Sequence, residues 1–138
     1  MRSRARPLLT PLLFLLATAV ASVPVAGAAV VSWNNPSGGS WSTAANWAPA
    51  GVPGAADDVR IDLAGSYTIT VTGAINIRSL TVGAAGGAQT ITGTSTITTG
   101  SPSAVTAGST GATLRTITLA GAGGFTVPAG SAITLQSC

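Results

Sequence analysis

From Val59 onward, β-branched residues alternate with small polar residues, and this pattern restricts the chain to strands and turns. Val59, Ile61 and Leu63 point one way while Arg60 and Asp62 point the other, a period of two that marks a strand with one buried face. No stretch supports a helix of ordinary length, so the predicted fold class is all-β. Further apolar sets follow at Tyr67/Ile69/Val71, Ile75/Ile77, Leu80/Val82, Ile117/Leu119, Phe125/Val127 and Ile133/Leu135.

An internal similarity favours a repeat architecture. Residues 77–87 align with residues 114–124 at an offset of 37, with five identical positions of eleven. A unit of this length fits two coils of a parallel β-helix or similar β-solenoid, whose short strands stack on one another about 4.8 Å apart. The alternative is a β-sandwich, which usually has longer strands and hairpin turns such as Asn-Gly or Asp-Gly; neither dipeptide occurs.

The segment 1–28 has the features of a secretory signal peptide. Residues 2–7 form a positively charged region with three arginines, and residues 8–20 form an apolar region. Two small-x-small cleavage sites follow, which end at Ala21 and Ala28, and cleavage after Ala28 is preferred. The alternative is a retained anchor, but the apolar run is shorter than the roughly 20 residues that span a bilayer. A secreted or cell-surface protein is therefore predicted, without a membrane span after removal of the leader.

A compositionally distinct segment, residues 29–58, contains all three tryptophans and several turn-forming clusters. Its pattern is Trp33, then Gly38-Gly39-Ser40-Trp41, Asn46-Trp47, Pro53 and Asp57-Asp58-Val59-Arg60-Ile61. This pattern resembles the module that opens many secreted bacterial surface proteins of the autotransporter-like or adhesin-like β-helix type. There it leads into strands such as Ser79-Leu80-Thr81-Val82-Gly83. More distantly, it is similar to the extracellular β domain named for its eight glycines.

The resemblance covers residues 33–83 and implies architecture rather than activity. It predicts that residues 59–138 form β-solenoid repeats. Such proteins usually continue much further, so the chain is expected to be either an N-terminal fragment or a short protein. No cap is apparent after Leu135, and an open edge is expected there.

The segment 29–58 has two interpretations. A solenoid needs a cap on its first coil, and three indoles folded over the end would seal it, with each N–H bonded at the rim. Alternatively, exposed indoles would form a platform that stacks on sugar rings, as in carbohydrate-binding modules. The residues assigned to the cap or to glycan binding are Trp33, Trp41, Asn46, Trp47, Pro53, Asp57 and Asp58.

Catalysis is not expected, because the sequence lacks His, Lys and Glu altogether. Asp57 and Asp58 face opposite ways in an extended chain, and Asp58 and Asp62 lie about 13 Å apart at the strand rise, too far for paired carboxylates. A calcium site on these three acids competes with simple structural roles, namely an acceptor for a backbone N–H and an Arg60/Asp62 pair. The structural roles are favoured, and no metal or cofactor is predicted.

Charge and threonine content bear on partners. After removal of the leader, three arginines balance three aspartates, so nucleic acid is not an expected partner.

The predicted function is a non-catalytic, bacterial, adhesin-like or structural surface protein that associates with glycan, matrix or another copy. The second candidate is the carbohydrate-binding module. The third is an ice-binding face on the alternating threonines of residues 68–72 and 90–98, although the offset of 37 matches only Thr81 with Thr118.

Overall fold

The computed structural model describes residues 27–105, 111–121, 124–126 and 133–136. Over these residues the chain is nearly all strand, and the helical part is one short 3-10 turn, η1 (Ala44–Asn46). The prediction of an all-β fold is confirmed. Residues 1–26 of the predicted signal peptide lie outside the described residues, as do Val127 and Cys138.

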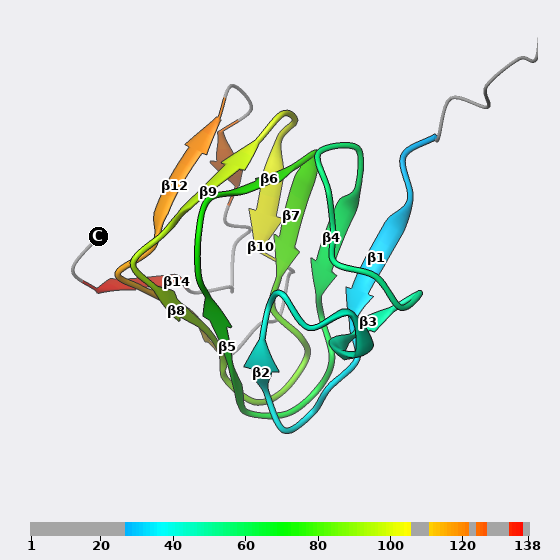
Figure 1. The fold of residues 1–138 in the computed structure, drawn as a ribbon. Coiled ribbons are helices and arrows are strands. Elements are labelled where there is room, and N and C mark those ends of the chain that lie inside the picture. The colour runs from blue at the N-terminus through cyan, green and yellow to red at the C-terminus, as the bar shows by residue number, and fades with distance from the viewer. Residues whose placement is uncertain (1–26, 106–110, 122–123, 127–132, 137–138) are drawn as a thin grey trace, which may run out of the picture.

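The strands form three sheets, which the chain visits from β4 onward in a fixed order: first, second, third, and first again (Figure 1). The first sheet contains β1 (Val30–Trp33), β3 (Trp47–Ala48), β4 (Asp58–Ile61), β7 (Ser79–Val82), β10 (Ser103–Val105) and β13 (Phe125–Thr126). The second contains β2 (Gly39–Ser40), β5 (Tyr67–Val71), β8 (Gln89–Gly93), β11 (Ala112–Arg115) and β14 (Ile133–Gln136). The third contains β6 (Ile75–Ile77), β9 (Thr96–Thr99) and β12 (Thr118–Gly121).

Neighbouring strands are parallel throughout the described sheets, except that β1 pairs antiparallel with β3. Val59 pairs with Leu80, and Thr90 pairs with Thr113, so a strand is repeated after far fewer residues than the similarity between residues 77–87 and 114–124 indicated. The predicted offset of 37 is therefore wrong as a structural period. Arg78 and Arg115, which that offset aligned, lie in different settings, because Arg115 pairs with Thr92 in the second sheet.

More residues separate β1 from β4 than separate β4 from β7, the next strand of the first sheet, since Val30 pairs with Asp58 whereas Asp58 pairs with Ser79. The additional length holds η1 and β3, of which β3 pairs with β1. The part of the tryptophan-rich segment between β2 and β4, which contains Trp41 and Trp47, is thus an insertion between strands of the sheets.

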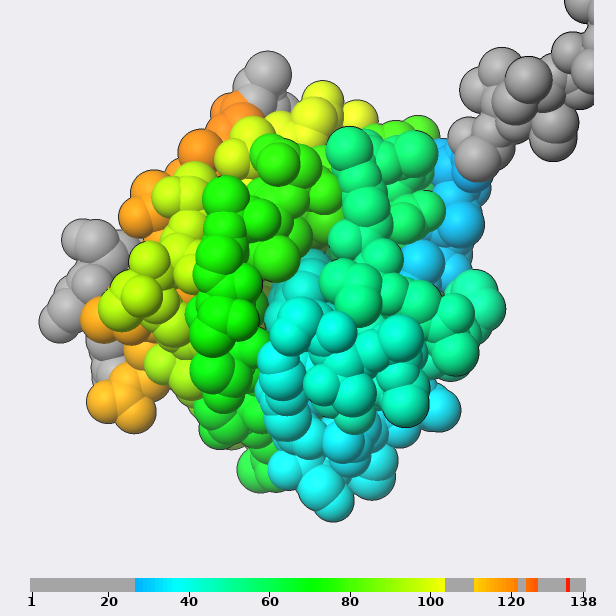
Figure 2. All heavy atoms as spheres, viewed as in Figure 1, coloured from blue at the N-terminus to red at the C-terminus, as the bar shows by residue number. Residues whose placement is uncertain are grey.

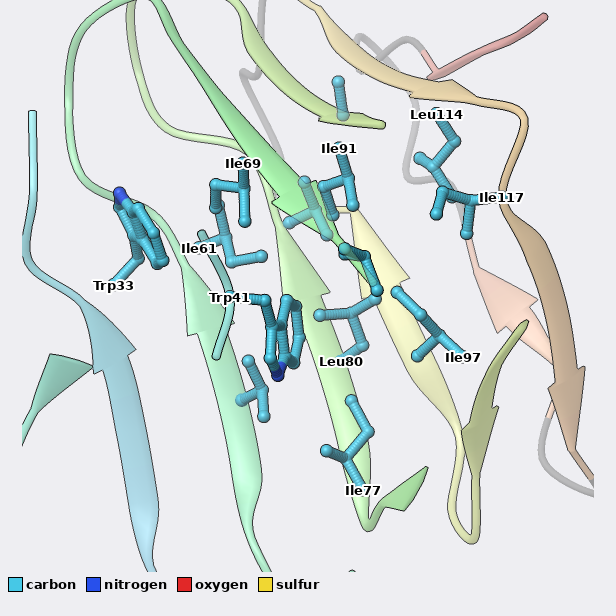
Figure 3. Packing of buried hydrophobic residues seen from close by; sticks show 14 of the residues in the cluster. Trp33, Trp41, Ile61, Ile69, Ile77, Leu80, Ile91, Ile97, Leu114 and Ile117 are labelled. Atoms are coloured by element: carbon cyan, nitrogen blue, oxygen red, sulfur yellow. The ribbon is translucent and has the colours of Figure 1, made fainter. Parts of the chain in front are cut away.

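The strand alternation predicted from the sequence is observed. Val59 and Ile61 are fully buried and Arg60 is exposed, and β5 alternates buried and exposed residues along its length. Buried side chains from the three sheets meet in one interior, which runs from Trp33 at one end past Trp41 and Leu80 to Leu114 and Ile117 at the other (Figure 3).

Candidate functional site

The three tryptophans predicted to act together are brought into one cluster, which also includes Tyr67. Trp47 lies at its centre, with edge-on contacts to Trp33 at a centroid distance of 5.0 Å and to Trp41 at 4.8 Å. Trp33 also stacks on Tyr67 of β5 at 6.4 Å. At most 2% of each tryptophan is exposed. We call these four residues the aromatic cluster.

The indole N–H groups are only partly satisfied. Trp33 donates its Nε1–H to the Asn35 carbonyl at 2.6 Å, and Trp47 donates to the Trp41 carbonyl at 2.7 Å. The Nε1 of Trp41 is buried without a hydrogen-bond partner among the described residues. The expectation that each indole N–H finds a partner is therefore wrong for Trp41, whose ring lies within the apolar interior.

Two asparagines fasten the loop around the aromatic cluster. The Asn46 side-chain amide donates to the Ser40 carbonyl at 2.9 Å, and its oxygen accepts from Asn35 Nδ2 at 2.9 Å. Asn35 also donates to the carbonyl of Gly38 at 2.7 Å. Asn46 was predicted from the sequence and is buried; Asn35 was missed, although the adjacent Pro36 indicated a turn at this point.

The same loop docks directly on the second sheet. The backbone N–H of Trp41 donates to the Thr70 carbonyl at 2.9 Å. Gly38 has a φ of 77°, and a Cβ placed there would lie 2.3 Å from the Thr68 carbonyl oxygen. Only glycine allows this close approach, so the Gly38-Gly39 pair of the motif has a structural purpose. Atoms of this cyan segment spread over the near side of the molecule (Figure 2).

Pro53 and the acidic residues lie at the start of β4. Pro53 is buried, and the Asp57 carboxylate accepts the backbone N–H of Gly54 at 2.8 Å, which closes a turn. Asp58 accepts from Arg78 Nε at 2.9 Å and also from Ser79. The hydrogen bond from Arg78 holds the pKa of Asp58 below its ordinary value. Both acids therefore join structural contacts of the strand start.

The predicted surface pair is also present, with Arg60 Nε at 3.3 Å from Asp62 Oδ2. Among the described residues, no group of three or more potential ligands is placed to hold a metal ion. No helix in this part of the chain is long and apolar enough to cross a membrane. A hollow of about 110 Å³ lies beside β12 and β13, between Leu119 and Phe125, and is lined by no titratable group of the described residues.

Tyr67 offers a test of the aromatic cluster by titration. Its hydroxyl donates to the Leu63 carbonyl at 3.1 Å. Burial of the phenol raises the pKa of Tyr67 to about 12, with a further contribution from the negative charge of Asp62. Because the unfolded chain loses the phenolic proton first, this stabilisation is complete below about pH 10 and is lost as the pH rises through about 12.

We expect the phenolate absorbance of the folded chain to appear with a midpoint near pH 12. The measurement is unambiguous, because Tyr67 is the only tyrosine in the sequence. In Tyr67→Phe the corresponding loss of stability between about pH 10 and 12 should be absent. A folded wild-type chain that titrates near pH 10 would contradict the enclosed position of the phenol.

The second sheet also presents a set of outward threonines. Thr68 pairs with Thr90, which pairs with Thr113, which pairs with Thr134. A parallel row contains Ser40, Thr70, Thr92 and Arg115. The sequence pattern indicated the individual strands of this face, but the offset of 37 concealed that threonines of successive strands lie side by side. We call this set the threonine face; its members are Thr68, Thr70, Thr90, Thr92, Thr113 and Thr134.

Searches of the sequence against family models and curated proteins, and of the fold against solved structures, found no match.

Proposed function

We propose that this chain is an exported, non-catalytic β-solenoid that acts as a structural or adhesin-like surface protein. The observation that carries the proposal is the progression of the strands: from β4 onward, each passage through the three sheets pairs parallel with the previous one, as in the series Thr68, Thr90 and Thr113. A solenoid produces this progression because each coil stacks on its predecessor. A β-sandwich of antiparallel hairpins does not produce it.

The tryptophan segment supplies the N-terminal cap in this proposal. Burial of Trp33, Trp41 and Trp47 supports a sealing role, since all three rings belong to the apolar interior. The same burial disfavours the carbohydrate-binding alternative, because a sugar can stack only on an exposed ring face. Asn46, Asp57 and Asp58 support the cap through the hydrogen bonds described above, and Pro53 is buried at the same place.

The exterior suits a presenting role rather than a catalytic one. Asp58 and Arg78 neutralise each other, as do Arg60 and Asp62, so the strand faces carry little net charge. The resemblance of the opening motif to surface-protein modules and the predicted leader favour a location outside the cell. Its partners would be glycan, matrix or another copy.

Expression of the full chain in a bacterial host with a general secretion pathway tests this proposal. We expect a protein that begins at residue 22 or 29 to appear outside the cytoplasm, as measured by intact mass. Circular dichroism of that product should be β-rich, and its tryptophan emission should be blue-shifted. Retention of the uncleaved chain inside the cell, or a product with red-shifted emission, would overturn the proposal. The control is the same chain expressed in cells whose export machinery is blocked, where it should stay uncleaved in the cytoplasm.

A further inference from the structure

The threonine face has a repeat in two directions. Along a strand, Thr68 and Thr70 point to the same side, a separation of about 6.8 Å at the strand rise. Across the sheet, Thr68 and Thr90 are on adjacent hydrogen-bonded strands, about 4.8 Å apart. The parallel pairing continues to Thr113 and then to Thr134. The face is thus a small two-dimensional lattice of identical side chains.

The chemistry of each lattice point is also uniform. Threonine presents one hydroxyl and one methyl group, and its β-branching restricts the χ1 angle. The hydroxyls of Thr68, Thr70, Thr90 and Thr92 make no hydrogen bond to another described residue, and these side chains are exposed or half-buried. The backbone beneath Thr90 and Thr92 is fixed by parallel strands on both sides. Such a face presents its hydroxyl groups to solvent in a repeated arrangement.

We propose that the threonine face binds ice. Both spacings of the array are close to oxygen repeats of the hexagonal ice lattice, so its hydroxyl and methyl groups match an ordered layer of water. Charge supports this partner: the described outward positions of the second sheet carry no carboxylate, and their one cation, Arg115, lies beside Thr92 at the end of its strand. An uncharged face fits an uncharged lattice.

The observations favour ice over a crystalline polysaccharide. A pyranose ring is usually held by stacking on an aromatic side chain, and the threonine face contains none. Trp41, whose backbone N–H bonds to the Thr70 carbonyl, and Tyr67, which precedes Thr68 on β5, are both buried. The inference deepens the proposed function, on which it rests, by naming the class of surface that one side of the solenoid recognises.

The test uses the secreted, leader-free chain and measures thermal hysteresis and inhibition of ice recrystallisation. Thr90→Tyr places a bulky ring at a position with threonine on both neighbouring strands. We expect the concentration needed for inhibition to rise about tenfold, as for a central contact of an interface. Thr98→Tyr is the matched control: Thr98 is similarly half-buried but lies on the third sheet between Asn76 and Ala120, and it should leave the activity unchanged.

A gain of activity is the second arm. Arg115 interrupts the row of Ser40, Thr70 and Thr92, so Arg115→Thr extends the array by one position and should increase thermal hysteresis. A merely structural role of the threonines predicts no such gain. Circular dichroism and the melting temperature of every variant verify the fold.

The outcomes separate this inference from the proposed function. A secreted, folded wild-type chain without ice activity overturns the inference and leaves the solenoid proposal intact. Equal losses in Thr90→Tyr and Thr98→Tyr also overturn it. Binding to crystalline cellulose or chitin that Thr90→Tyr abolishes, in the absence of ice activity, would reassign the face to polysaccharide. A chain that is not exported or not folded refutes the proposed function instead.

Discussion

Replacement of Trp47 by alanine is expected to lower the free energy of unfolding by about 3–5 kcal/mol, the range for truncation of a buried tryptophan. Trp47 is 2% exposed and contacts both other indoles of the aromatic cluster. Alanine also leaves the Trp41 carbonyl without its donor. Since domains of this size are stable by only about 5–15 kcal/mol, the transition in urea or heat should move far towards milder conditions.

Two further variants make this result specific. Trp47→Phe keeps an aromatic ring but loses the N–H, and its loss should be smaller than that of alanine. Val52→Ala lies in the same segment, where Val52 is 46% exposed, and should change stability by no more than about 0.5 kcal/mol. If Trp47→Ala abolished binding to a glycan while the unfolding transition stayed in place, the cap would be refuted and an exposed platform restored.

Burial within each strand could be predicted from the sequence more reliably than the pairing between strands. Within a strand, the alternation of Val59, Arg60 and Ile61 determined burial, because side chains on a strand alternate between the two faces. The relation between strands was harder to predict. Glycine, alanine and threonine are so frequent that segments in different sheets resemble one another, and the alignment of Arg78 with Arg115 was wrong for this reason. The observed pairings instead join Ile69 with Ile91 and Ile91 with Leu114.

The candidate site was predictable to a similar extent. The grouping of the three tryptophans followed from their apolar surface and from the need to seal an apolar interior. The partners that complete the site, Asn35 and Tyr67, come from a turn and from a distant strand. No local pattern specifies the contact of Trp33 with Tyr67, because it depends on the register with which the loop docks on β5. The threonine face required knowledge of the strand register for the same reason.

Ile91 tests the register at the centre of the molecule. Its side chain is fully buried, and its strand neighbours at the same level are Ile69 and Leu114. Ile91→Ala should therefore lower the free energy of unfolding by about 2–5 kcal/mol, as measured by urea titration, because the stacked strands leave a cavity that neither neighbour can fill.

The adjacent residue provides the control. Thr92 follows Ile91 on β8 but points to the opposite face, where it is only half-buried. Thr92→Ala should change the free energy of unfolding by less than about 1 kcal/mol, mainly through the weaker strand preference of alanine. Equal losses at the two positions, or a larger loss at Thr92, would mean that β8 is paired one residue out of register, because a shift of one residue exchanges the buried and exposed faces of a strand. A much larger loss of unfolding free energy in Ile91→Ala than in Thr92→Ala would confirm the inward row of Ile69, Ile91 and Leu114. It would also confirm the outward row of Thr70 and Thr92.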